Sequence, residues 1–288
     1  MKRTKPQLTR RDFLKAALIT SIVTPIMGTA GMAYGVSVEP DQVEVTHVEL
    51  TLPRLPAPFD GYRIAQLSDI HMDGWMTRER LLETVRLVNE QAPDVVALTG
   101  DFVTTGIEYD ADDLIVPFLA LTPADGTFAV MGNHDWYAGA QDIRALLNES
   151  GVTELRNAAV TIQRDDSALH ILGVDSYTKG TSRVDVALDG VPESGATVLL
   201  VHEPDYADVS AATGRIDLEI SGHSHGGQVR YPLLGAPVLP ALGRKYPIGL
   251  YQIGDMLHYT NRGLGMLPPR VRINCRPEIT IYKLRSAV

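Results

Sequence analysis

Five short clusters of oxygen- and nitrogen-donor residues mark the chain, each at the end of a predicted strand. In chain order they are Asp69-Ile70-His71, Gly100-Asp101, Gly132-Asn133-His134-Asp135, His202 and Gly222-His223-Ser224-His225. Any one of these clusters arises often by chance, but all five rarely occur in this order. Divalent cations bind carboxylate, imidazole and amide side chains, commonly with about four protein ligands each. The clusters together therefore predict a site for two divalent metal ions.

A two-metal site needs an anion between its cations, because two dications about 3.5–4 Å apart repel each other strongly. Asp101 stands alone at a predicted strand end, and we expect its carboxylate to be this bridge. A water shared by two such cations loses a proton far below its bulk pKa, and the resulting hydroxide can attack phosphorus. The expected chemistry is hydrolysis of a phosphoester by a metal-bridging hydroxide, without a covalent enzyme intermediate.

The series of motifs resembles that of the calcineurin-like metallophosphoesterase superfamily, which runs D-x-H, G-D, G-N-H-D/E, H and G-H-x-H. The resemblance covers roughly residues 60 to 284. A carboxyl-terminal tail resembles the exported, YkuE/YaeI-like phosphodiesterase branch of that superfamily, and it reads Asn261-Arg262-Gly263-Leu264-Gly265 followed by Arg276-Pro277-Glu278.

The resemblance implies metal ligands that fall into two groups around the shared carboxylate of Asp101. The first group is Asp69, His71 and His225, and the second is Asn133, His202 and His223. Manganese, iron, zinc and cobalt all suit such a mixed set of oxygen and nitrogen donors, so the sequence leaves the metal open.

The resemblance also implies a catalytic role for a histidine that binds no metal. His134 would stabilise the transition state or protonate the leaving oxygen, and Asp135 would orient its imidazole. The alternative for His202, which follows the apolar run 198–201, is a buried structural histidine. Three further strand histidines, His47, His170 and His258, fit no ligand spacing, and we interpret them as structural or exposed.

Candidate substrate-binding residues lie outside the motifs. Trp75 could stack on a sugar or base near the cleft, or pack over the first helix. Arg244 and Arg262 are candidates for a phosphate clamp through bidentate contacts. The proline-rich apolar segment 232–240 either contacts a lipid or membrane surface or folds back onto the core.

The amino terminus resembles a twin-arginine export signal. Arg10-Arg11 lies within the segment 9–15 and precedes an uncharged stretch from residue 16 to residue 34. Cleavage after Ala33 and retention of the segment as a membrane anchor are both possible. We therefore expect residues 1–36 to form the signal or anchor, and residues 37–288 to form the catalytic domain on the periplasmic face of the cytoplasmic membrane.

Composition and charge limit the partners of this domain. The chain has 288 residues, 44% of them hydrophobic, which suffices for one large core. Its net charge of −9 disfavours non-specific nucleic-acid binding, which depends on Lys and Arg neutralising phosphates. The single cysteine, Cys275, allows no internal disulfide, and we interpret it as structural.

The pattern of the chain predicts an α/β fold. Strand-like runs at 43–52, 63–68, 95–99, 127–131, 169–174, 197–201 and 218–221 alternate with helical patterns at 78–91, 112–121 and 141–149. Later runs at 249–253, 257–260 and 279–284 predict a second sheet packed on the first. The resemblance implies a two-sheet β-sandwich flanked by helices, and the pattern is compatible with it.

The leading hypothesis is a two-metal phosphodiesterase that acts on an envelope phosphoester, with the twin-arginine machinery as its export partner. A second hypothesis is a pyrophosphohydrolase of lipid-linked nucleotide sugars, although several such enzymes carry Arg where His134 stands. A non-catalytic metal-binding envelope protein is a third, and a membrane-anchored assembly factor whose apolar loop binds a partner is a fourth.

Overall fold

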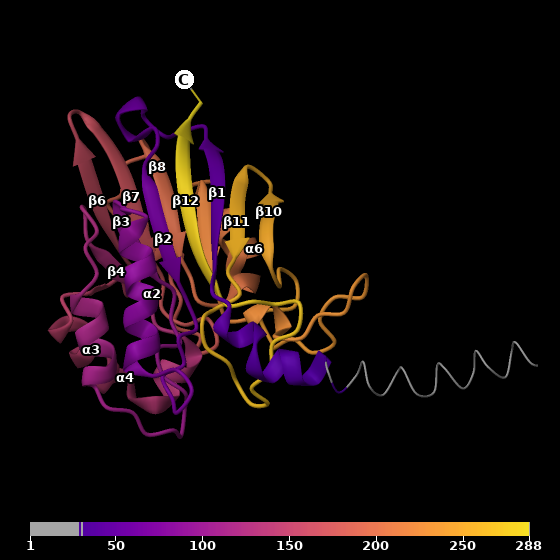
Figure 1. Ribbon diagram of the computed structural model, residues 1–288. Coiled ribbons are helices and arrows are strands. Elements are labelled where there is room, and N and C mark those ends of the chain that lie inside the picture. Colours follow the sequence, from indigo (N-terminus) through magenta and orange to yellow (C-terminus); the bar gives the residue numbers. More distant parts are fainter. Residues whose placement is uncertain (1–28, 30, 288) are drawn as a thin grey trace, which may run out of the picture.

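The computed structural model describes residues 29 and 31–287, so the predicted export signal at 9–15 lies outside the described residues. Figure 1 shows two layers of strands with helices against them. Within the described ranges, no helix is long and apolar enough to cross a bilayer.

Residues 31–37 are helical, and the carbonyl oxygen of Gly35 accepts a hydrogen bond from the Arg272 amide, so this segment packs on the domain.

Each layer is a six-stranded sheet. The first has the order β1 (Glu44–Leu52), β12 (Glu278–Ser286), β2 (Arg63–Leu67), β3 (Val95–Leu98), β4 (Thr127–Ala129) and β5 (Thr153–Glu154). The second has the order β10 (Gly249–Ile253), β11 (Met256–Thr260), β9 (Leu218–Ser221), β8 (Ala196–Leu200), β7 (Ser167–Gly173) and β6 (Ala158–Arg164). Only the pairs β12 with β2, β10 with β11, and β6 with β7 are antiparallel.

The central strands are apolar because both of their faces are covered. Every residue of β3, β8 and β9 is buried, as expected for parallel strands in an α/β protein. The cluster between the sheets includes Ile64 and Val95 from the first sheet and Val198 and Leu218 from the second.

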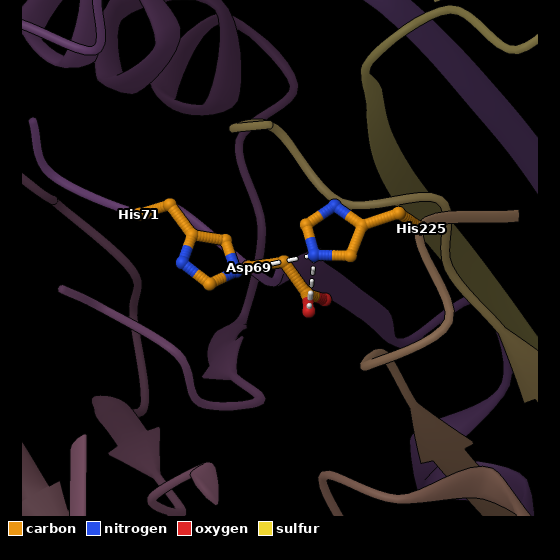
Figure 2. A group of neighbouring side chains, drawn as sticks. All are labelled: Asp69, His71 and His225. Carbon is orange, nitrogen blue, oxygen red and sulfur yellow. Dashed lines mark hydrogen bonds and ion pairs between the residues drawn. The ribbon is translucent and has the colours of Figure 1, made fainter. Parts of the chain in front are cut away.

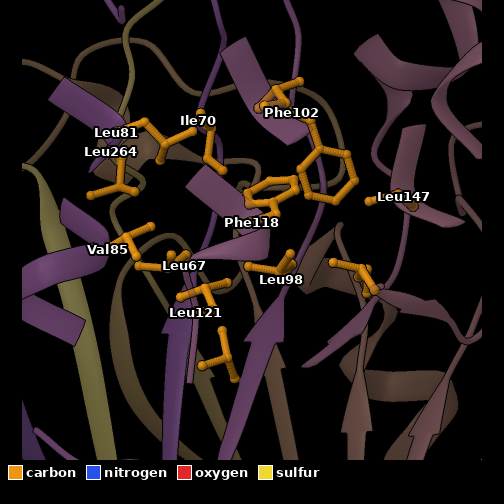
Figure 3. Packing of buried hydrophobic residues seen from close by; sticks show 14 of the residues in the cluster. Leu67, Ile70, Leu81, Val85, Leu98, Phe102, Phe118, Leu121, Leu147 and Leu264 are labelled. Carbon is orange, nitrogen blue, oxygen red and sulfur yellow. The ribbon is translucent and has the colours of Figure 1, made fainter. Parts of the chain in front are cut away.

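Helices cover the outer faces of both sheets. The helices α2 (Arg78–Glu90), α3 (Asp112–Leu119) and α4 (Asn133–Glu149) lie on the first sheet, where Leu81 and Phe118 pack with Leu67 and Leu98 (Figure 3). The short helices α5 (Val184–Ala187) and α6 (Ala207–Ala212) cover the second. Single 3-10 turns connect other segments: η1 (Glu39–Asp41), η2 (Ala57–Phe59), η3 (Pro204–Tyr206) and η4 (His225–Gly227).

The predicted fold class is confirmed, but three details of the prediction are wrong. The late strands do not form a sheet of their own, because β10 and β11 extend the β6–β9 sheet and β12 inserts between β1 and β2. Strands β5 and β6 were not predicted. Helix α4 begins at Asn133 rather than at residue 141, because a kink at Gly139, with φ of 137°, interrupts its periodicity.

The carboxyl ends of β2, β3, β8 and β9 determine where the motifs meet. These strands pair in parallel within each sheet, and a motif follows each of them directly. Loops at the carboxyl ends of parallel strands share one edge, where α/β proteins place their sites. The fold therefore brings four of the five motifs together, and Gly132-Asn133 joins them where α4 begins.

Candidate metal centre

Six of the predicted ligands form two compact groups. Within each group the candidate ligand atoms lie within 4.8 Å of one another, and the groups are Asp69, His71 and His225, and Asp101, His202 and His223. Figure 2 shows the first group, in which the imidazoles of His71 and His225 approach each other beside the Asp69 carboxylate. The Nε2 atoms of the two histidines lie 3.1 Å apart, and Nε2 of His225 lies 3.3 Å from Oδ1 of Asp69.

Asp101 lies within reach of both groups. Its Oδ2 atom is 3.2 Å from Nε2 of His202 in its own group and 3.6 Å from Nε2 of His71 in the first group. Its Oδ1 atom accepts a hydrogen bond from the backbone amide of His134 at 2.8 Å. The carboxylate is thus held between the two clusters, in the position that the sequence predicted for a bridging ligand.

Backbone carbonyls fix the tautomers of two histidines in the second group. Nδ1 of His202 lies 2.8 Å from the Thr99 carbonyl, and Nε2 of His223 lies 2.7 Å from the Ala241 carbonyl. A carbonyl oxygen only accepts, so these nitrogens carry the protons, and the opposite nitrogens keep their lone pairs in the neutral rings. Those opposite nitrogens, Nε2 of His202 and Nδ1 of His223, face each other at 3.2 Å. Two lone pairs that face each other at 3.2 Å repel, unless a cation or a proton lies between them.

Asn133 completes the evidence that the site fits metal ions. Among the described residues its Oδ1 atom is buried and has no hydrogen-bond partner, which costs free energy in a protein interior. The same side chain lines the cavity beside Asp101 and His223. An amide oxygen placed in this way suits a divalent cation.

Burial and charge set the protonation of the cluster. Burial lowers the pKa of His71 to about 4 and lowers the pKa of His225 well below its usual value, so both rings are neutral and able to bind metal. Burial alone would raise the pKa of Asp101, but the nearby imidazoles of His202, His71 and His134 together lower that pKa. Burial opposes the charged form of His202 as well, yet Asp101 raises its pKa. Each of these two side chains therefore stabilises the charged form of its neighbour.

Five of the six clustered residues have left-handed backbone conformations. Their φ values are 49° for Asp69, 50° for His71, 54° for Asp101, 66° for His223 and 50° for His225. Such a conformation costs a residue with a side chain on the order of 1–3 kcal/mol and persists where the surrounding structure enforces it. This concentration of strain at one point of the fold is typical of a functional site.

The motif glycines leave room for the carboxylates. A Cβ at Gly132 would overlap Oδ1 of Asp101, and one at Gly222 would overlap Oγ of Ser68 and Oδ2 of Asp69. Ser68 also donates a hydrogen bond of 2.6 Å to Asp69. The glycines at these two positions are therefore required by close approach.

The predicted role of Asp135 needs correction. Its carboxylate accepts hydrogen bonds from the backbone amides of Asp101 and Phe102, both at 2.8 Å, and of Gly132 at 2.9 Å. Among the interactions of the described residues, none joins this carboxylate to the His134 ring. Asp135 instead holds the second and third motif loops against each other.

Thr105 is the residue that orients His134. Its backbone amide donates to Nδ1 of His134 at 3.2 Å, and its Oγ1 atom lies 3.0 Å from the same nitrogen. Because an amide N–H only donates, Nδ1 accepts, and the neutral ring carries its proton on Nε2. No sequence signal indicated this contact, since Thr105 belongs to no motif.

Arg272 is a second residue that sequence analysis missed. Its guanidinium is fully buried and donates to the carbonyls of Gly265 at 2.6 Å, Cys275 at 2.9 Å and Gly263 at 3.0 Å. The amide of Gly265 in turn donates to the carbonyl of Asp69 at 2.7 Å. Arg272 therefore holds the carboxyl-terminal segment 263–275 in place, and this segment in turn binds the backbone of the first motif through Gly265.

Substitution of Arg272 by methionine is expected to lower the free energy of unfolding by about 3 kcal/mol, because several buried carbonyls lose their donor. The measurement is urea unfolding, with Arg276→Met, an exposed site four residues away, as the control. Equal stabilities of the two variants would contradict the structural role of Arg272.

The structure does not support substrate contact in the cavity for the three candidate residues, and Trp75 follows the alternative prediction of packing against the first helix. Trp75 packs on the core of the first sheet under the Arg80 guanidinium, which is 4.4 Å from the ring centroid. Arg262 forms ion pairs of 2.9 Å with both Glu278 and Glu44. Arg244 is exposed, and none of the three lines the cavity described below. These observations contradict an Arg262 phosphate clamp and a stacking role for Trp75 in that cavity.

The remaining histidines and the cysteine are structural or exposed, as expected. His170 is buried between Thr161 Oγ1 and the Ser194 carbonyl, each 2.9 Å away. His258 is buried with Glu219 at 3.1 Å, whereas His47 is exposed. The sequence predictions for these residues are confirmed. Cys275 is also buried, and its thiol donates to the carbonyl of His225.

Ser224 requires separate consideration, because residues 222–226 also have the letters Gly-x-Ser-x-Gly of a hydrolase nucleophile elbow. Its hydroxyl donates to the Pro247 carbonyl at 2.6 Å and accepts from the Gly226 amide. The segment leads into a single 3-10 turn rather than into the α-helix of an elbow. The structure therefore does not support a serine nucleophile at this position.

A cavity of about 590 Å³ opens over the two groups of candidate ligands. Polar side chains line one part of it, and they include Asp101, Asn133, His134, His223 and His225. The rest is mainly apolar, with walls from residues 229–240 and 267–273 and from Met32. The proline-rich segment thus lines the cavity, with its tip exposed, instead of folding back onto the core.

Comparison with known proteins is consistent with this geometry. The profile of a family described as calcineurin-like phosphoesterase matches residues 62–227. The chain is similar to the uncharacterized metallophosphoesterase YkuE of Bacillus subtilis (strain 168), with 32% identity over 97% of this chain and 99% of the relative. It is also similar to the phosphodiesterase YaeI of Escherichia coli (strain K12), with 32% identity over 96% and 99%. A zebrafish (Danio rerio) transmembrane protein with a metallophosphoesterase domain shares 29% identity over 95% of this chain and 63% of its own length.

Proposed function

The chain belongs to the calcineurin-like phosphoesterase family and is a metal-dependent phosphoester hydrolase, and on this premise we propose that it cleaves phosphodiesters of the cell envelope. The observation that carries the proposal is the pair of three-residue clusters joined by Asp101. Hydrolysis of a phosphodiester is further supported by the similarity to the E. coli relative, which is named a phosphodiesterase.

The proposed ligands follow the two clusters. Asp69, His71 and His225 would hold one metal ion, Asn133, His202 and His223 would hold the second, and Asp101 would contact both. The donors suit manganese, iron, zinc or cobalt. Two bound cations would supply Lewis acidity at the phosphoryl oxygens and would acidify a water molecule between them.

The residues of this chain have three tasks in the proposed reaction. Asp101 would reduce the repulsion between two bound cations, and the carbonyls of Thr99 and Ala241 fix the tautomers of His202 and His223 that leave the opposite nitrogens free to bind metal. His134 donates a hydrogen bond, and finally its proton, from Nε2 to the departing oxygen, because Thr105 occupies Nδ1. A leaving alkoxide is strongly basic, so such a proton donor lowers the barrier to its departure.

The envelope location is proposed from the amino-terminal sequence. The residue pair Arg10-Arg11 and the uncharged stretch that follows are typical of export through the twin-arginine route, which would place the domain on the outer face of the cytoplasmic membrane. The name of the zebrafish relative as a transmembrane protein supports an association with membranes. The proposal for the substrate is therefore a phosphodiester accessible from that face.

The test compares bis(p-nitrophenyl) phosphate with p-nitrophenyl phosphate as substrates of the protein, after metal removal and reloading with manganese. We expect turnover of the diester to exceed turnover of the monoester and to disappear on chelation. Faster hydrolysis of the monoester would contradict the proposed phosphodiesterase. Diester turnover that survives complete removal of metals would contradict the metal centre.

A further inference from the structure

The apolar half of the cavity continues onto the surface of the protein. The segment 231–240 contributes Tyr231, Val238 and Leu239 to the cavity wall, and its tip is formed by Leu233 and Leu234. The side chains at the tip are not packed: Leu233 is 106% exposed, Leu234 84% and Val238 74%. No other large hydrophobic side chain of the described residues is more than 60% exposed. Large apolar side chains in water beside an apolar cavity mark an interaction surface.

The first described residues of the chain lie beside the same apolar part of the cavity. Met32 is exposed, lies in the helical segment 31–37, and lines the cavity together with Tyr231 and Val238. In Figure 1 the indigo helix of residues 31–37 and the orange loops lie at the same end of the molecule. The preceding sequence, residues 16–28, contains no charged residue and follows Arg10, Arg11 and Lys15. If residues 16–28 inserted into a bilayer, the membrane surface would lie close to the mouth of the cavity, because Met32 lines that cavity.

The charge of the surrounding segments favours an anionic surface. Residues 31–38, 225–250 and 261–277, which contain the apolar walls, have seven Arg or Lys residues and no Asp or Glu. Three of these cations pair with carboxylates from outside these segments, namely Lys245, Arg262 and Arg270. Arg244 and Arg276 are exposed. This absence of acidic residues is unusual in a chain with a net charge of −9, and it suits the negative surface of a bilayer.

We infer that residues 231–240, with the helical segment 31–37, seat the protein on an anionic lipid bilayer, so that the cavity receives the headgroup of a phosphodiester lipid. The side chains of Leu233 and Leu234 would enter the interface between headgroups and acyl chains. The apolar wall formed by Val238, Leu239 and Val271 would cover the first carbons of the lipid chain. This inference rests on the proposed function for its substrate, whereas the seating itself can be tested separately.

A polarity-sensitive dye on an introduced cysteine tests the contact directly. The only native cysteine, Cys275, is 1% exposed, so Leu233→Cys in the full chain provides a single accessible thiol. The matched control is Leu119→Cys, an exposed leucine at the end of α3. The probes are vesicles of phosphatidylglycerol mixed with phosphatidylethanolamine, and vesicles of phosphatidylcholine alone. Because the dye reports on the loop itself, binding through residues 16–28 alone would not change its signal.

With anionic vesicles, we expect the emission of the dye at position 233 to shift to the blue and to increase several-fold, while the dye at position 119 does not respond. The response should be weaker with phosphatidylcholine. In a Leu233→Ser/Leu234→Ser chain labelled through Val238→Cys, most of the shift seen with the same label and both leucines present should disappear. Turnover of soluble bis(p-nitrophenyl) phosphate should remain in the unlabelled Leu233→Ser/Leu234→Ser chain, because neither leucine lines the cavity.

Two outcomes would overturn the seating. One is a dye at position 233 that does not respond although the chain floats with the vesicles, which would leave the amino terminus as the only membrane contact. The second is a blue shift without vesicles in a chain that sediments as a dimer, which would identify the surface as a contact between copies. Failure of the proposed function would appear differently, as absent turnover of the soluble diester with the dye response intact.

Discussion

Replacement of Asp101 by asparagine is expected to reduce diester turnover by about a thousandfold to ten-thousandfold. The change keeps the shape of the side chain but removes a carboxylate whose Oδ2 atom lies 3.2 Å from a ligand nitrogen of its own cluster and 3.6 Å from one of the other cluster. Metal centres of this kind contribute several kcal/mol of charge stabilisation to the transition state, and each 1.36 kcal/mol corresponds to a factor of about ten in rate. The measurements are the initial rate with saturating manganese and the metal content of the purified chain.

The matched control for this prediction is Asp113→Asn. Asp113 is a partly exposed carboxylate on α3 that pairs with Arg78 and does not line the cavity over the ligand clusters. It should retain full activity and metal content. If Asp101→Asn bound two metals per chain and kept turnover within tenfold of the wild type, the bridging role of Asp101 would be wrong.

Substitution of His134 by alanine is expected to lower kcat by about a hundredfold to ten-thousandfold, the range for loss of a general acid, while two metals per chain are retained. The imidazole lies beside the cluster, with ring centroids of His134 and His71 4.9 Å apart. Since Nε2 carries the proton, the loss should be largest for diesters with an alkoxide leaving group. It should be smallest for nitrophenyl esters, whose leaving group departs without protonation.

The control for this variant is His47→Ala, because His47 is an exposed histidine on β1. Loss of metal from His134→Ala, or an equal loss of rate for both types of ester, would show that His134 does not act as the proton donor. A Thr105→Val variant should reproduce part of the effect, since it removes the hydroxyl near Nδ1 but keeps the backbone amide.

The sequence predicted the strands of the core because their apolar character is local. Every strand that a motif follows is a short buried run, and buried runs of this length are recognisable from composition. The partner of each strand was not predictable in the same way. Strand β12 inserts between β1 and β2, although more than 200 residues separate it from either one. Pairing over such separations depends on the whole chain, and the short pattern of β12 contains no information about it.

The candidate ligands were predictable for a related reason. Asp69, Asp101, His202 and His223 each come within a few residues of the end of a parallel strand, and strand ends meet at one edge of a sheet. The supporting contacts were not predictable from residue types. Asp135 binds backbone amides rather than the His134 ring, and Arg272 binds carbonyls. Backbone partners depend on loop conformation, which the order of side chains does not encode.

The substrate-binding interpretations of Trp75 and Arg262 failed for a common reason. Trp75 was a candidate because it closely follows the first motif, and Arg262 because a guanidinium can bind phosphate, and neither property fixes where a side chain lies. The side chain of Trp75 nevertheless packs on the first sheet, and that of Arg262 is neutralised by Glu44 and Glu278. Neither proximity in sequence nor residue type therefore predicted access to the cavity.

The most direct test of the two-metal site is the metal content of the wild-type chain measured in parallel with its diester turnover. The apoprotein should be inactive, and turnover should rise with added manganese until two ions are bound per chain. The melting temperature should rise with occupancy, because ions that bind only the native state stabilise it. Full activity with one bound ion, or with none, would contradict the assignment of both clusters to metal binding.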